Sequence, residues 1–169
     1  MKILLCIASF LFIMNSSFAQ EDIVKIIDDL TVTWDAKAED LKSYDKLKDL
    51  CRDRGYRTDI FDLLDKIHHY DTTLYNTVTS KYDASKDKEA RATLDDIENL
   101  EREYTTRAFR KFIHQECNEY NMVENSFGKE GEEYELERKR VESELVKYVT
   151  SITSQIDLID EHVHHLKKL

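Results

Sequence analysis

The sequence contains no proline, and its 169 residues include only three glycines, Gly55, Gly128 and Gly131. Both residue types interrupt helices, because proline lacks a backbone N–H and glycine loses more conformational freedom on folding than other residues. Their scarcity argues against a fold with many tight turns and predicts long helices. The glycines are expected where helices stop, since glycine is favoured just after a helix C-terminus.

The motifs of common catalytic sites are missing as well. The sequence has no Gly-rich phosphate-binding loop, no nucleophile elbow and no paired-carboxylate motif in a recognisable context. We therefore expect a protein that acts by binding, without catalysis. An all-helical secreted enzyme of an unrecognised type is the third option, after the two binding functions described below.

Long apolar runs are absent from most of the chain. The exception is residues 3–14, about twelve residues, which is too short to span a bilayer that needs about 20. Small residues follow at Ser17 and Ala19, and this order is typical of a secretory signal peptide. The prediction is a signal peptide at 1–19 and a single helical-bundle domain at 20–169. The domain is expected to be exported, to the periplasm or the extracellular medium, without membrane insertion.

Basic side chains are outnumbered, with 25 Lys and Arg against 35 Asp and Glu, for a formal net charge of −10. An acidic surface repels the phosphates of nucleic acids and anionic lipids. We expect no nucleic-acid partner. The charges are interspersed along the chain, as on solvated helix faces.

Cysteine is also scarce. Of the three cysteines, Cys6 lies within the predicted signal peptide, which leaves Cys51 and Cys117 in the mature chain. In an oxidising compartment an even pair favours a disulfide, and the alternative is two unpaired buried thiols. Folding the chain back at about residues 56 and 85 brings the two cysteines to heights that differ by roughly 9 to 12 Å. Helix ends predicted from a sequence are shifted by about two to four residues at each turn, which accounts for this difference in height. We therefore predict a Cys51–Cys117 disulfide.

Apolar residues recur at steps of three and four along four segments, the spacing of amphipathic helices. The segments run from about residue 22 to 54, from 59 to 82, from 87 to 123, and from 132 to near the C-terminus. The predicted core positions are Ile23, Ile27, Leu30, Trp34, Ala38, Leu41, Tyr44, Leu47, Cys51, Ile60, Leu64, Ile67, Leu74, Val78, Leu94, Ile97, Leu100, Tyr104, Ala108, Phe112, Ile113, Cys117, Tyr120, Val123, Tyr134, Val141, Leu145, Val149, Ile152, Ile156, Ile159, Val163 and Leu166.

The helix ends are predicted from local residue types. The β-branched residues Thr31, Val32 and Thr33 weaken the first helix and mark a place where it can break. Gly55 is expected to end that helix. The N-caps of the next two helices are expected at Thr58 or Asp59 and at Ser85 or Asp87.

Short connections between long amphipathic helices favour antiparallel neighbours, so the predicted fold is all-α, an up-down-up-down four-helix bundle. Its packing should resemble that of a left-handed coiled coil. The third helix, at roughly 40 residues, should be about 60 Å long, so that helices three and four project beyond helix two. These longer helices offer a surface for a homodimer.

Histidines and carboxylates at metal-binding spacing occur at Glu161-x-x-His164 and Asp65-x-x-His68. A metal centre in a bundle needs several such ligands at one level. The predicted register places His68 and His69 some 10 Å from the group His162, His164 and His165. We therefore predict surface histidines, with no metal and no cofactor.

Asp71 interrupts the apolar stripe of the second helix, between Ile67 and Leu74. A buried and unpaired carboxylate is very costly, so Asp71 should either pair with Lys37, Arg102 or the hydroxyl of Tyr104 or point into water. Asp71 and Tyr104 are thus the candidate polar core residues. A small-molecule or metal-binding bundle that uses these positions is the alternative function.

Aromatic side chains are numerous for a narrow bundle, with nine tyrosines and one tryptophan. They are predicted to pack in the core with hydroxyls at its rim, or to form an aromatic groove at the projecting end of helices three and four. Because a narrow bundle leaves little cavity, we expect the binding partner to be another protein.

Overall fold

The computed structural model describes residues 24–81, 91–92, 95, 104–124 and 131–166. These residues form helices and contain no strand, so the all-α prediction is confirmed for the described part of the chain. The elements are a helix at 24–41, called helix 24–41 below, followed by α2 (Tyr44–Arg52), α3 (Arg54–Lys81), α5 (Thr106–Glu124) and α6 (Glu132–Leu166). None of the described helices is both long enough and apolar enough to cross a membrane.

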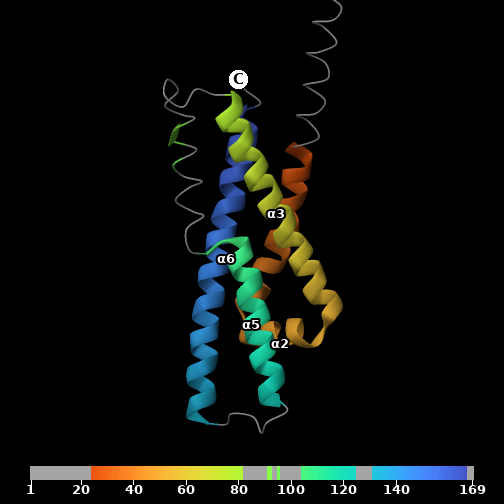
Figure 1. The fold of residues 1–169 in the computed structure, drawn as a ribbon, viewed down its shortest axis with the longest axis vertical. Helices are drawn as coiled ribbons and strands as arrows, with labels where there is room; N and C mark the ends of the chain where they lie inside the picture. Colours follow the sequence, from red (N-terminus) through yellow and green to blue (C-terminus); the bar gives the residue numbers. More distant parts are fainter. Residues whose placement is uncertain (1–23, 82–90, 93–94, 96–103, 125–130, 167–169) are drawn as a thin grey trace, which may run out of the picture.

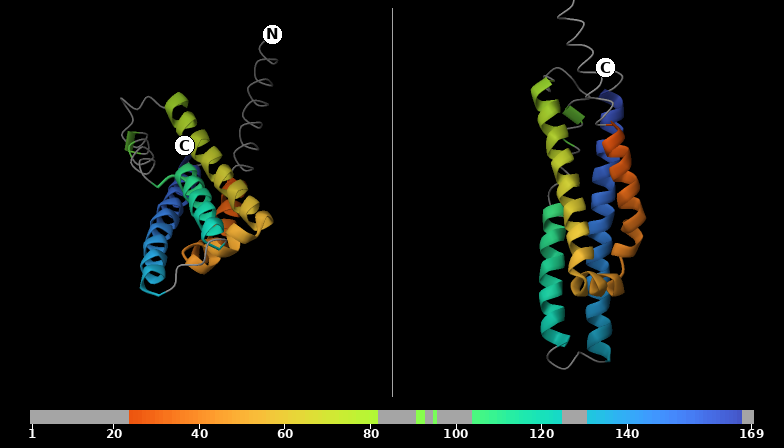
Figure 2. Two further views of the ribbon diagram at one scale, coloured as in Figure 1. Left: turned by 60° about the horizontal axis from the view of Figure 1, so that its bottom comes forward. Right: turned by 90° about the vertical axis from the view of Figure 1, so that its right-hand side faces the viewer.

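The helices are arranged around α6, which spans the length of the molecule (Figure 1). Helix 24–41 and α3 lie beside the C-terminal half of α6, and α5 lies beside its N-terminal half (Figures 1 and 2). The chain runs down helix 24–41, up α3, down α5 and up α6. The short α2 lies across this direction and contacts α3, α5 and α6.

The prediction of one continuous helix over 22–54 is wrong. Helix 24–41 ends in a turn at Lys42 and Ser43, and Ser43 has the extended dihedral angles φ −94° and ψ 134°. The expected break at Thr31–Thr33 does not occur. The reason is that the hydroxyls of Thr31 and Thr33 donate to carbonyls four residues earlier, at 3.0 and 2.7 Å, which satisfies these side chains within the helix.

The start of α3 also differs from the prediction. The helix begins at Arg54, so Gly55 lies in its first turn and does not end a helix. The side chain of Asp53 accepts hydrogen bonds from the backbone N–H groups of Gly55 and Tyr56, at 2.8 and 3.1 Å. Asp53 is therefore the N-cap, in place of the expected Thr58 or Asp59.

The prediction of one helix from 87 to 123 is wrong at Tyr104 and Thr105, which are not helical. The hydroxyl of Thr105 accepts from the N–H of Ala108 at 3.0 Å and caps α5. With 19 residues, α5 is about 28 Å long, roughly half the expected length. Figure 1 shows α5 and α6 extending past the start of α3, the second predicted helix, at one end. The following expected features lie outside the described residues: the signal peptide, the caps Ser85 and Asp87, the core positions Ile23, Leu94, Ile97 and Leu100, the side chains of the core positions Leu74, Val78, Tyr120, Val123 and Leu166, and Gly128.

The apolar stripes form the core at most predicted positions. Trp34 is fully buried, and its indole N–H donates to the hydroxyl of Thr153 on α6 at 2.9 Å. Phe109, which was not among the predicted core residues, is also fully buried. The buried apolar residues are Val24, Ile27, Leu30, Trp34, Ala38, Leu41, Leu47, Leu50, Cys51, Ile60, Phe61, Leu63, Leu64, Ile67, Phe109, Ile113, Cys117, Val141, Leu145, Val149, Ile152, Ile156, Ile159 and Val163.

A disulfide joins α2 to α5. The sulfur atoms of Cys51 and Cys117 lie 2.07 Å apart and the Cα atoms 4.9 Å apart, so the predicted pairing is present. Both residues are buried. Because α2 lies across the direction of the other helices, the bridge connects a transverse helix to a lengthwise one.

Candidate functional site

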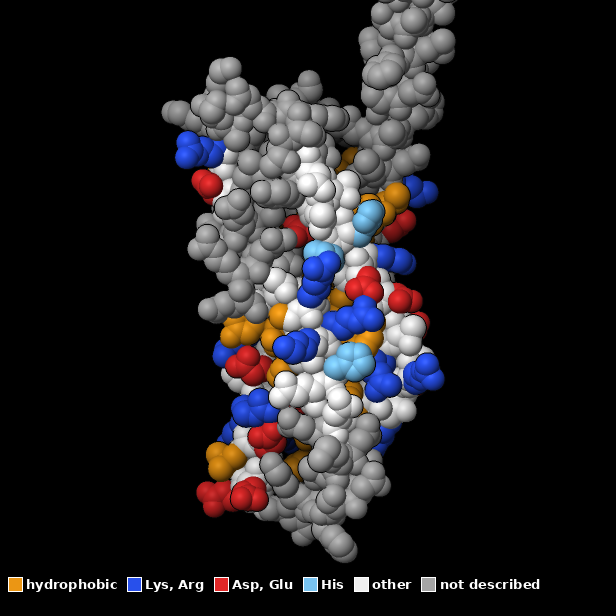
Figure 3. Space-filling model, in the orientation of Figure 1, with side chains coloured by type: hydrophobic (Ala, Val, Ile, Leu, Met, Phe, Trp, Pro, Cys, Tyr) orange, Lys and Arg blue, Asp and Glu red, His pale blue; other side chains and the backbone are white. Residues whose placement is uncertain are grey.

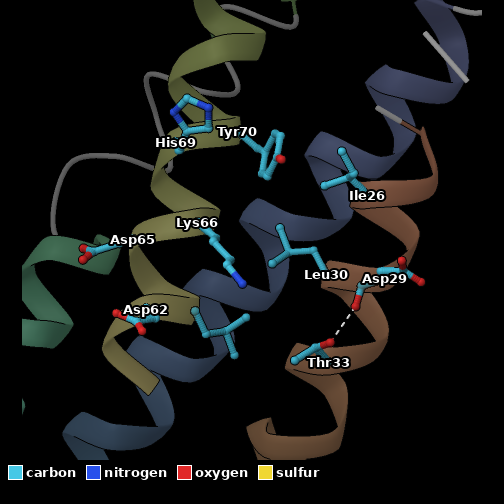
Figure 4. Close-up of a pocket in the computed structure, with 10 residues that line it drawn as sticks. Ile26, Asp29, Leu30, Thr33, Asp62, Asp65, Lys66, His69 and Tyr70 are labelled. Carbon is cyan, nitrogen blue, oxygen red and sulfur yellow. Dashed lines mark hydrogen bonds between the residues drawn. The ribbon is translucent and has the colours of Figure 1, made fainter. Parts of the chain in front are cut away.

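The candidate site is an open groove between helix 24–41 and α3, with a volume of about 650 Å³ (Figure 4). It lies beside the stretch that holds the two adjacent histidines of α3. The lining residues are Ile26, Asp29, Leu30, Thr33, Asp62, Leu63, Asp65, Lys66, His69 and Tyr70.

Apolar side chains form the inner part of the groove. Leu30 and Leu63 are each only 5% exposed and belong to the core, so they form its floor. Ile26 is 41% exposed, and half-buried Tyr70 lies across from it. This arrangement leaves apolar surface in contact with water.

Charged side chains surround the apolar part. In Figure 4 the amine of Lys66 extends into the space between the two helices, while Asp29 lies on the opposite helix. Asp65 turns toward α5, where it pairs with Arg110. The ring of His69 contacts the ring of Tyr70 edge-on, with centroids 5.3 Å apart. The groove thus combines an apolar floor with a rim of mixed charge.

Asp71 does not line the groove. It is 6% exposed, so the predicted alternative in which it points into water is wrong. It interacts with a polar or charged group. Of the three expected partners, Lys37 has a contact with another residue, since its ammonium lies 5.5 Å from the ring centroid of Tyr56. Arg102 is outside the described residues. Pairing with Arg102 stays a prediction.

Tyr104, the other candidate polar core residue, lies in an aromatic cluster with α5 and α6. Its ring centroid is 5.0 Å from that of Tyr148, and the ammonium of Lys147 is 5.9 Å from the Tyr104 ring. Tyr148 also packs against Phe109 and Phe112, at 5.1 and 5.2 Å. Burial, together with nearby Glu144 and Tyr104, raises the pKa of Tyr148. These contacts do not bring Tyr104 to Asp71.

A second aromatic pair lies near the start of α2. The rings of Tyr44 and Tyr134 meet edge-on at 6.0 Å, and the ammonium of Lys48 donates to the Tyr134 hydroxyl at 3.1 Å. Burial is the main cause that raises the pKa of Tyr44. Tyr44 and Tyr134 are both half-buried, and Tyr44 packs against the buried core. The side chain of Tyr120 lies outside the described residues.

His68 and His69 are on α3 and His162 is near the end of α6, while the side chains of His164 and His165 lie outside the described part. Among the described residues, no group of three or more His, Cys, Asp or Glu side chains could hold a metal ion.

The sequence analysis missed a buried carboxylate, Glu116. Its exposure is 7%, and its Oε1 accepts from the guanidinium of Arg140 on α6 at 2.8 Å. Glu116 and Cys117 are adjacent in the helix, and both are buried. The reason is that α5 contacts three other helices, α2, α3 and α6.

Comparison with protein-family models, curated proteins and solved structures finds no match to this chain. The function is therefore argued from the residues. The groove can recognise a partner through an apolar floor, a mixed rim and a well-packed framework.

Proposed function

We propose that this protein is an exported four-helix bundle that binds another protein, with no catalytic role. In this proposal the groove between helix 24–41 and α3 is a binding surface. The bundle topology is proposed as up-down-up-down, with α2 as a transverse segment of the first helix.

The observation that carries the proposal is the exposed apolar surface of Ile26 above a floor of Leu30 and Leu63. Protein interfaces have a well-packed apolar centre inside a polar rim, and an amphipathic helix binds by laying its apolar face into a groove of this kind. Asp29, Asp62 and Lys66 supply the rim.

The openness of the groove favours a protein partner over a small molecule. A volume of 650 Å³ would suffice for a drug-sized ligand, but such ligands are typically buried over about 70 to 90% of their surface. A groove that lies between two helices and opens along its length cannot enclose a small ligand in this way. A helix from another protein buries only one face in the groove and keeps its polar face in water, so it does not need to be enclosed.

Export is supported by two sequence features, the signal-peptide pattern over 1–19 and the pair of mature cysteines. The disulfide between Cys51 and Cys117 is of the kind that persists in oxidising compartments. Mass spectrometry of the N-terminus of the exported protein tests the predicted cleavage after Ala19.

The binding proposal is tested by affinity capture from the native exported fraction, followed by titration with the captured protein. Ile26→Asp places a charge in the apolar part of the groove and should weaken binding by at least about tenfold, as for an interface anchor. Val32→Asp is the matched control, because Val32 is 70% exposed on the same helix and does not line the groove. It should leave the affinity within about twofold.

Equal affinity of the Ile26→Asp and Val32→Asp proteins for the captured partner would show that the groove is not the binding surface. A captured small molecule or a stoichiometric transition metal, found by mass spectrometry or elemental analysis, would instead favour the alternative function near Asp71.

A further inference from the structure

A stripe of basic side chains runs along the outer face of α5. Arg107, Arg110, Lys111 and His114 follow one another at steps of three, one and three, which places them on one side of the helix. Arg110 is half-buried and the other three are exposed. These four residues are called the basic stripe below. Figure 3 shows Lys, Arg and His side chains gathered across the middle of the face formed by α3 and α5.

The cations of the basic stripe lie together on one helix face. On the other helices, several basic side chains have an acidic partner within the protein: Lys42 with Glu39, Lys46 with Asp40, Lys48 with Asp45, Arg138 with Glu142, Arg140 with Glu116 and Glu137, and Lys147 with Glu144. In the stripe, Arg110 pairs with Asp65 of α3. Arg107 and Lys111 form no ion pair with the described residues, although acids are in excess over the whole chain.

The middle of the stripe is held in place by packing against α3. The guanidinium of Arg110 lies 4.8 Å from the ring centroid of Phe61, and the ring of His114 lies 5.1 Å from the same ring. Phe61 is itself buried, with 7% exposure. Side chains fixed in this way lose little conformational freedom when a partner binds.

We propose that the basic stripe is a docking surface for an acidic segment of a partner protein. Arg107 and His114 are seven residues apart, a distance of about 10 Å along the helix axis. That length matches two turns of an acidic helix, or a short extended segment with alternating carboxylates. The partner carboxylates would pair with Arg107 and Lys111, the two stripe cations without an ion pair among the described residues.

Charge complementarity favours a narrow acidic segment over a membrane or a duplex. The net charge of the chain is −10, and the first turn of α6 carries Glu132, Glu133 and Glu135. A broad anionic surface would meet this acidic remainder of the protein and be repelled. A segment no wider than one helix contacts the stripe alone. Arg110 of the stripe pairs with Asp65, which lines the groove, but Arg107 and Lys111 do not line it, so their contribution can be tested without the partner of the groove.

The test measures fluorescence anisotropy of a labelled polyglutamate peptide titrated with the full mature protein. The double variant Arg107→Glu with Lys111→Glu should weaken binding by at least about tenfold, because two attractions become repulsions. The matched control is Lys25→Glu with Lys139→Glu, which changes the net charge by the same amount at exposed positions of helix 24–41 and α6. The control should change the affinity by about twofold or less, and added salt should weaken binding to the native protein.

Equal weakening by the stripe variant and the control would overturn the proposal, because the peptide would then sense only net charge. Binding of a labelled polyglutamine peptide with the same affinity would overturn it too. A further overturning result is stronger stripe-dependent binding to phosphatidylserine vesicles than to the peptide, or stripe-dependent self-association in sedimentation. If circular dichroism shows that the double Glu variant is unfolded, Arg107→Gln with Lys111→Gln replaces it, with a smaller expected loss in the same direction.

Discussion

Glu116 is a carboxylate buried on α5, and its contact with Arg140 links α5 to α6 across the molecule. Arg140 is also held by Glu137, one turn earlier on α6, at 2.7 Å. The two carboxylates differ in burial, because the side chain of Glu116 is 8% exposed and that of Glu137 is 27% exposed. Hydrogen bonds with both carboxylates raise the pKa of Arg140. The same guanidinium, itself 47% exposed, therefore makes one part-buried and one more accessible ion pair.

Glu116→Ala should lower the free energy of unfolding by about 1–3 kcal/mol, the range for removing a partner from a buried charged hydrogen bond. Glu137→Ala is the control and should cost about 0–1 kcal/mol, since water screens the more exposed pair. Urea denaturation followed by circular dichroism measures both. A larger loss for Glu137→Ala would contradict the assigned burial.

Phe109 illustrates which core residues the sequence did and did not reveal. The predicted stripe of α5 passed through Ala108 and Phe112, which are only half-buried, whereas Phe109 is fully buried. The spacing from Phe109 to Ile113 is also helical, so periodicity alone allowed either line. The choice was decided by the position of α5 against α3 and α6, which depends on tertiary packing.

Phe109→Ala should lower the free energy of unfolding by about 3–5 kcal/mol, because it removes a buried aromatic ring and leaves a cavity. Phe112→Ala should cost less, since Phe112 keeps part of its surface in water. Chemical denaturation of the two variants side by side gives the comparison. Equal losses would show that Phe112 belongs to the core as fully as Phe109.

At the scale of elements, the helices were easier to predict than their ends. The stripe from Ile27 to Leu41 and the stripe from Val141 to Val163 are both buried as expected, because apolar periodicity directly reports a buried helix face. The breaks at Ser43 and Thr105 were missed, since residues of these types also occur inside helices. The groove could not be predicted either, because its lining comes from two helices whose relative position the sequence pattern does not specify.

Asp53→Ala should lower the free energy of unfolding by about 1 kcal/mol, because it removes the acceptor for two N–H groups at the start of α3. Asp59→Ala tests the sequence-based alternative. Asp59 is exposed within α3, so its loss should change stability by no more than about 0.5 kcal/mol. The result would be reversed if the helix began at the position expected from the sequence.

The contact between helix 24–41 and α6 gathers acidic groups of like charge. Burial raises the pKa of Asp157 on α6, and the neighbouring charges of Asp35 and Asp160 raise it further. A carboxyl whose pKa is higher in the folded state binds a proton more readily when folded. Its ionised form therefore opposes folding, and that cost appears as the pH rises from the unfolded pKa through the folded pKa.

Asp157→Asn should consequently raise stability at neutral pH, by less than about 1 kcal/mol because solvent screens this exposed site. The gain should shrink as the pH falls below the folded pKa of Asp157, where the native carboxyl is already neutral. Thermal unfolding at several pH values measures it, with Asp59→Asn as a control on α3. A gain that is independent of pH would point to a cause other than charge.

At the scale of the whole molecule, the Cys51–Cys117 disulfide links segments separated by 66 residues and joins the transverse α2 to α5. Cross-linking a loop of this length should stabilise the fold by about 4 kcal/mol, mainly by restricting the unfolded chain. Reduction should therefore lower the urea midpoint strongly. The variant Cys51→Ala with Cys117→Ala should show the lower midpoint with and without reductant. A native protein whose midpoint does not respond to reductant, although free thiols are detected, would mean that the packing of α2 alone holds the two ends of the loop together.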